Sequence, residues 1–161
     1  MQKYLETEPA AGAVLIATPT ARDLKRAQMS ALRNHPWAVL KTVLTGNPDQ
    51  FYHDTKACRK VLFASDMSPE TDKALEQISL QSEPSRVVSD LLNFKSGPPL
   101  TPCRALVITA GNDNSVSQET IAQHKAIYGA EVKNYPGKSH ELIITPGWES
   151  VADDIGQWLT G

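Results

Sequence analysis

Several features that would assign a chain to a class at once are scarce in this sequence. It has only two cysteines, Cys58 and Cys103, too few for a disulfide framework, so we expect a reducing, cytoplasmic environment. The clustered cysteine and histidine spacing of a structural zinc site is missing, and no pattern predicts a cofactor. The formal net charge is −2 with mixed signs, which gives no electrostatic attraction for nucleic acid. These absences exclude disulfide-rich, zinc-finger and nucleic-acid-binding classes.

Long apolar runs are also missing. Ala10 to Ala17, the longest run near the start, is much shorter than the roughly 20 residues of a membrane span. Acidic Glu6 and Glu8 precede it in place of a basic region, so we expect neither a span nor a signal peptide. What the chain does have is 40% hydrophobic residues over 161 positions, enough to bury a core. We therefore expect residues 1–161 to form a single domain.

The stretch from Arg104 to Asn114 organises the other patterns. Its run of apolar, partly β-branched residues stops at Gly111, and the next ionisable residue is Asp113, so it predicts a buried strand with a carboxylate just past its end. After a helical segment and a second short strand, Ala130 to Tyr135, a glycine-containing turn presents His140. The carboxyl ends of parallel strands share one edge of a sheet, where sites of α/β folds are built. We therefore expect Asp113 and His140 to form a catalytic acid and base pair.

The flanking segments predict an α/β fold with a short parallel sheet of about three strands and flanking helices. Gly12 to Thr18 is apolar on both faces, which is typical of a strand covered by helices on both sides. Residues 19–102 contain short helical pieces separated by prolines and polar turns. Ser117 and Gly129 are placed to cap a helix. A terminal helix carries an apolar stripe made of Trp148, Val151, Ile155, Trp158 and Leu159.

In their order, these motifs resemble the C-terminal half of the α/β-hydrolase fold enzymes. Gly111-Asn112-Asp113 is similar to the turn that carries the catalytic acid of that family, and Pro136-Gly137-Lys138-Ser139-His140 is similar to the turn that carries its histidine. The resemblance implies a partial α/β-hydrolase core in residues 1–18 and 103–161 and a helical lid insertion over about 19–102. It also implies that Asp113 is the triad acid and His140 the triad base.

The nucleophile of that family stands in a Gly-x-Ser-x-Gly elbow, and no such motif occurs in this chain. The resemblance therefore implies the C-terminal portion of a serine-type hydrolase for carboxylic esters or related acyl substrates, inactive alone because its serine lies outside this chain. The expected small molecule is an apolar, ester-like substrate. Gly12 to Thr18 would form an apolar sheet edge, so we also expect self-association or pairing with a complementing N-terminal half.

Other interpretations stay open at this stage. The chain could be a non-catalytic module of the same fold, one that dimerises or binds a partner or an apolar ligand. Asp113 could be an ordinary turn aspartate bonded to local backbone amides, with His140 a structural histidine.

Five further positions carry predictions of their own. Ser65 and Ser139 are the serines to test as substitute nucleophiles, although neither stands on a strand-to-helix elbow. Asp153 and Asp154 lie off the apolar stripe of the last helix, so we expect both to be solvated. His124 has no partner pattern, and we expect it at the surface or in the lid.

Overall fold

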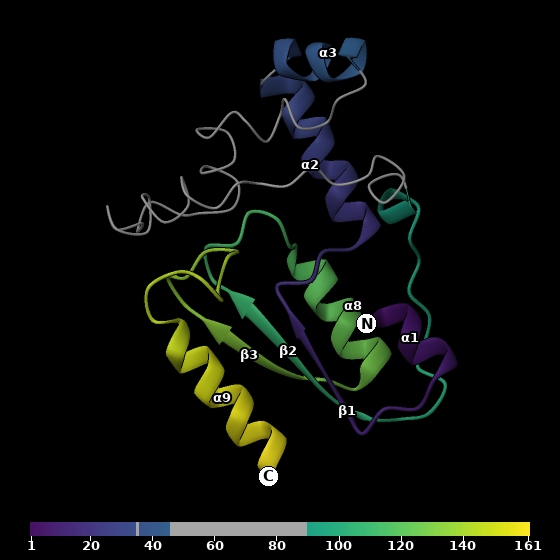
Figure 1. The fold of residues 1–161 in the computed structure, drawn as a ribbon, viewed down its shortest axis with the longest axis vertical. Helices are drawn as coiled ribbons and strands as arrows, with labels where there is room; N and C mark the ends of the chain where they lie inside the picture. Colours follow the sequence, from purple (N-terminus) through teal and green to yellow (C-terminus); the bar gives the residue numbers. More distant parts are fainter. Residues whose placement is uncertain (35, 46–89) are drawn as a thin grey trace.

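The computed structural model describes residues 1–34, 36–45 and 90–161 (Figure 1). Within these ranges the helices and strands, in chain order, are α1 (Gln2–Thr7), β1 (Gly12–Ile16), α2 (Ala21–Asn34), α3 (Pro36–Thr45), β2 (Arg104–Ala110), α8 (Gln118–Tyr128), β3 (Glu131–Tyr135) and α9 (Trp148–Thr160).

The three strands form one parallel sheet in the order β1-β2-β3. In this register Ile16 pairs with Ile108, and Ala110 pairs with Tyr135. Six consecutive residues of β2 are buried, because the strand is central and both of its faces are covered. The predicted α/β class with a short parallel sheet and flanking helices is therefore confirmed.

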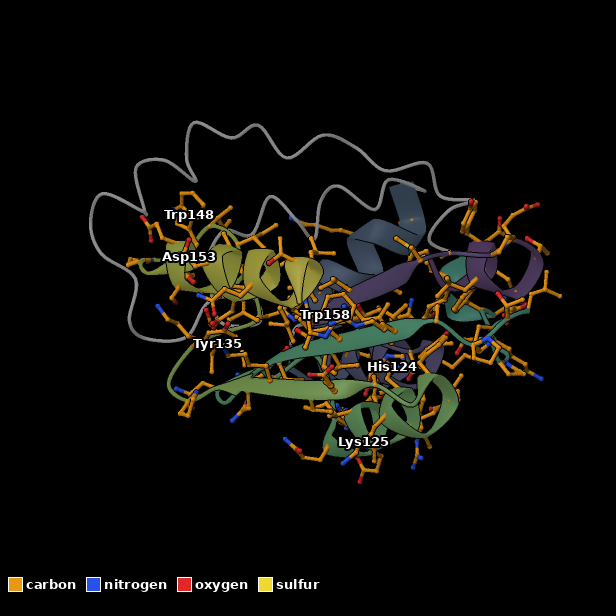
Figure 2. The ribbon with its side chains drawn as sticks, turned by 90° about the horizontal axis from the view of Figure 1, so that it is seen from below. His124, Lys125, Tyr135, Trp148, Asp153 and Trp158 are labelled. Atoms are coloured by element: carbon orange, nitrogen blue, oxygen red, sulfur yellow. The ribbon has the colours of Figure 1, made fainter. Side chains whose placement is uncertain are left out.

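The core consists of two apolar layers, one on each face of the sheet, because successive side chains of a strand point to opposite faces. Ala105 and Val107 pack with residues of α1 and α8 on one face, and Leu106 and Ile108 pack against α9 on the other. Figure 2 shows α8 and α9 on opposite sides of the sheet. This arrangement leaves the carboxyl edge, where the strands end, as the place for a site.

α8 begins and ends where the sequence predicts. The Ser117 hydroxyl accepts a hydrogen bond from the Thr120 N–H, which satisfies one of the free amides of the first turn. Gly129 ends the helix with φ 61°, a left-handed conformation that glycine adopts without strain.

The predicted apolar stripe of α9 is only partly buried. Val151 is buried, and Ile155 and Trp158 pack against the core. Trp148 and Leu159 are exposed, contrary to the prediction. These two residues stand in the first and last turns of α9, whereas the middle of the helix supplies the contact with the sheet.

α2 and α3 extend away from the sheet on the side where the strands end (Figure 1). They belong to the predicted helical lid insertion, but residues 46–89 of that segment lie outside the described residues. The lid therefore stays a prediction.

Ile108 gives a direct test of the central strand. Its side chain is 0% exposed, so Ile108→Ala should lower the free energy of unfolding by about 2–5 kcal/mol through the cavity it leaves. Val132→Ala, on edge strand β3 and 40% exposed, should change it by no more than about 0.5 kcal/mol. Urea denaturation of both variants checks this, and equal costs would contradict the assignment of β2 as the core strand.

Candidate active site

The turns after β2 and β3 leave the sheet side by side. The Gly111 N–H donates to the Tyr135 carbonyl at 2.9 Å, and the Asn112 N–H donates to the Lys138 carbonyl at 2.9 Å. A Cβ on Gly111 would lie 3.0 Å from the Pro136 Cα, so a larger residue would push the turns apart. The parallel register and this glycine together bring two turns into contact: the turn after β2 that carries Asp113, called the acid turn, and the turn after β3 that carries His140.

Asp113 and His140 meet at this edge. The His140 Nδ1 lies 2.9 Å from the Asp113 Oδ2, and the two side chains are 16% and 4% exposed. An ionised carboxylate only accepts hydrogen bonds, so Nδ1 carries the proton and the lone pair of Nε2 is left for another partner. The two side chains are therefore in contact as expected, and their catalytic role stays a prediction.

The second carboxylate oxygen of Asp113 is held by the backbone. Its Oδ1 accepts hydrogen bonds from the N–H groups of Ser115, at 2.6 Å, and Val116, at 3.0 Å. Asp113 is thus a turn aspartate and the partner of His140 at once, since each oxygen serves one purpose. Its side chain is held from both sides by these hydrogen bonds.

Opposing effects set the pKa of His140. Burial disfavours the imidazolium and lowers this pKa, whereas the hydrogen bond and charge of Asp113, with the charge of Glu141, raise it. The net result is a His140 pKa above its ordinary value. Such an imidazole takes up a proton more readily than a free one, as a general base must.

A small cavity lies behind Asp113. It has a volume of about 10 Å³, room for about one water molecule, and Ala17, Thr18 and His124 are among its lining residues. It is too small for a substrate.

The structure tests one of the two substitute nucleophiles, and Ser139 finds no support. Ser139 is buried, and its hydroxyl has no hydrogen-bond partner within the described part of the chain, so it does not face a substrate. Ser65 lies outside the described residues.

The prediction for His124 was wrong. This residue is buried in α8, and its Nε2 lies 3.0 Å from the Thr18 carbonyl oxygen. Thr120, His124 and Tyr128 recur every four residues and form the face of α8 that packs on the sheet. That spacing was the available signal in the sequence.

The prediction for Asp154 holds only in part, since its side chain is partly exposed but paired, whereas Asp153 is exposed as expected. Asp154 accepts a hydrogen bond from the Tyr135 hydroxyl at 2.5 Å and pairs with Lys133 at 2.5 Å. Burial, and then the hydrogen bond and charge of Asp154, raise the pKa of Tyr135. Figure 2 shows Tyr135 beneath the α9 residues, so these contacts tie the end of β3 to that helix close to the His140 turn.

Sequence reasoning missed one residue near the site. Asp23 in α2 is buried, and its Oδ1 accepts a hydrogen bond from the Ser117 hydroxyl at 2.7 Å. Ser117 directly follows the two residues whose amides hold Asp113, so the Asp23 carboxylate is in contact with the acid turn.

A comparison with protein-family models and with curated proteins found no match to this chain. Within the described ranges, no cluster of His, Cys, Asp and Glu could hold a metal ion. In the same residues, no helix is long and apolar enough to cross a membrane.

The pairing of His140 with Asp113 makes a pH-dependent prediction. A pKa raised by folding adds stability at pH values below the ordinary imidazole pKa, and this stability is lost as the pH rises through the folded value. Asp113→Asn should therefore lower the His140 pKa and cost about 1–3 kcal/mol at about pH 6, with a smaller cost at about pH 9.

Histidine titration by NMR, with His140→Gln to assign the signal, measures the first effect, and urea denaturation measures the second. An unchanged pKa in Asp113→Asn would contradict the pairing.

Proposed function

We propose that this chain supplies the acid and base half of a serine-type hydrolase site for carboxylic esters or related acyl substrates. The nucleophilic serine would come from outside the sequence. The observation that carries the proposal is the 2.9 Å contact between the His140 Nδ1 and the Asp113 Oδ2 at the carboxyl edge of a parallel sheet. The likeness of the Gly111–Asp113 and Pro136–His140 turns to α/β-hydrolase motifs adds to it.

Each residue has a defined role in this mechanism. The Nε2 of His140 takes the proton of the serine hydroxyl as that oxygen attacks the acyl carbon, and it later returns the proton to the leaving group. Asp113 holds the ring in the Nδ1–H tautomer and stabilises the imidazolium that forms.

The site would be completed along the open edge of β1. In the described sheet this strand pairs on one side only, with β2, and its sequence is apolar and uncharged from Gly12 to Ile16. Such an edge pairs readily with another chain. We infer that a complementing segment carrying the serine adds to the sheet there. A second copy of this chain could occupy the same edge, but it would not supply the serine.

A second candidate function is a non-catalytic module that binds a partner or an apolar ligand. One observation favours it. In the described part of the chain, no serine hydroxyl is bonded to His140.

Ester hydrolysis separates the two candidates. We expect the chain alone neither to hydrolyse a short nitrophenyl ester nor to react with a fluorophosphonate serine probe, because it lacks the Gly-x-Ser-x-Gly elbow. Produced together with the segment encoded upstream of Met1 in its genome, it should do both. His140→Ala should then reduce hydrolysis at least about a thousandfold.

Asp153→Asn, which removes an exposed carboxylate on α9, is the matched control and should leave the rate unchanged. Hydrolysis that survives His140→Ala would contradict the proposed mechanism. An upstream frame without a nucleophile elbow would favour the binding module.

The open edge of β1 can be tested by removing one backbone donor. The Ala17 N–H donates to the Ile108 carbonyl and so points toward β2. Successive amides of a strand point to opposite sides, and Val14 lies three residues before Ala17. The Val14 N–H therefore points toward the open edge. Val14→Pro should therefore weaken association, while Val14→Ala, which keeps the donor, should not.

Light scattering over a range of protein concentrations measures this. A strictly monomeric wild-type chain at high concentration would contradict association through β1.

A further inference from the structure

Asp23 is a buried carboxylate that joins segments far apart in the sequence. Its side chain is 1% exposed and lies in the first turn of α2. Its Oδ2 accepts hydrogen bonds from Thr20, through both the N–H and the hydroxyl, and from the Thr120 hydroxyl at 2.5 Å. A buried charge is costly unless it is fully bonded, and this one is. Burial opposes the charged form, but these hydrogen bonds outweigh it and lower the pKa of Asp23.

The other oxygen of Asp23 reaches the loop that carries the triad acid. Its Oδ1 accepts from the Ser117 hydroxyl at 2.7 Å and from the Ser117 N–H at 3.3 Å. The two preceding amides, of Ser115 and Val116, donate to the Oδ1 of Asp113. Three consecutive backbone amides are thus divided between two carboxylates.

This division links the two carboxylates mechanically. The Ser115 and Val116 amides can reach Asp113 only while the loop holds its curvature, and Ser117 marks the end of that curve. At the other end, the hydrogen bonds of Gly111 and Asn112 to the His140 turn fix the loop. Asp23 fixes the end that those bonds do not reach.

We propose that Asp23 is a positioning residue for the acid and base pair. By holding Ser117, it keeps residues 113–117 in the conformation in which the Oδ1 of Asp113 is bound by amides and its Oδ2 faces His140. The importance of this effect for catalysis rests on the proposed function, whereas the effect itself does not. Because Asp23 belongs to α2, the position of that helix is coupled to the imidazole.

A purely structural role for Asp23 makes a different prediction. In that case, any loss of a hydrogen bond to the Asp23 carboxylate would reduce stability and leave the pKa of His140 unchanged. The two oxygens of Asp23 allow the positioning role and the structural role to be tested separately. Oδ1 binds Ser117, at the end of the acid loop, residues 113–117, and Oδ2 binds the Thr120 hydroxyl inside α8.

Ser117→Ala and Thr120→Val form the matched pair of variants in the full-length chain. Each removes one hydroxyl bond to Asp23 without changing a charge, but only Ser117→Ala alters a residue of the loop 113–117. Ser117→Ala also removes the bond from the Thr120 N–H that caps α8, so Ser117→Gly, which a helix N-terminus tolerates almost as well as serine, is measured beside it. Two quantities are measured by NMR: the pKa of His140, whose facing charges are Asp113 and Glu141, and the exchange rate of the Val116 amide.

We expect Ser117→Ala to lower the pKa of His140 in the same direction as Asp113→Asn. It should also raise Val116 amide exchange about tenfold, the factor expected when one hydrogen bond to a charged group is lost. Thr120→Val should change neither quantity.

Asp23→Asn should act like Ser117→Ala, and Asp153→Asn, which removes an exposed carboxylate of α9, controls for charge alone. If Asp23→Asn does not fold, Ser117→Ala and Thr120→Val decide the result by themselves. An unchanged His140 pKa in folded Ser117→Ala, or an equal change of that pKa in Thr120→Val, would overturn the positioning role. None of these measurements uses a substrate, so they stay valid if the chain does not hydrolyse an ester. An unchanged His140 pKa in Asp113→Asn would count against the pair itself.

Discussion

The structure of the candidate site depends on how one buried carboxylate divides its two oxygens. Asp113 gives Oδ1 to the backbone amides of its own turn and Oδ2 to the imidazole of His140. If only the amides were bound, it would be a turn residue, and if only the histidine were bound, it would be free to rotate. With both, the acid is fixed and the histidine tautomer is determined. A buried charge with both oxygens hydrogen-bonded also costs the fold less than an unbonded one.

The fold supplies this arrangement through backbone constraints rather than side-chain packing alone. Parallel strands must end at the same edge, and the pairing of Ala110 with Tyr135 places two turns next to each other. Gly111 permits the close approach that lets the turns exchange hydrogen bonds. The apolar layers on the two faces hold β2 in place, and Asp23 extends the support to the far end of the acid loop. The site is thus built from elements distant in sequence and adjacent in space.

The residues that were predictable from the sequence are those whose signals are local. The apolar run that stops at Gly111, the turn before His140, and the caps Ser117 and Gly129 each depend on a few neighbouring residues. Asp23 was not predictable because its role depends on Ser117 and Thr120, more than 90 positions away. Asp154 was misjudged for the same reason, since its partners Tyr135 and Lys133 lie on another element. Trp148 and Leu159 fit the helical period, but periodicity does not tell where the sheet beneath a helix ends.

The tautomer of His140 tests this account most directly. Nitrogen chemical shifts of the imidazole, recorded above its pKa and assigned with His140→Gln, distinguish a protonated Nδ1 from a protonated Nε2. The account predicts a ring locked with the proton on Nδ1, facing Asp113, and with a bare Nε2. A ring that carries its proton on Nε2, or that averages between the two forms as a solvent-exposed histidine does, would contradict it.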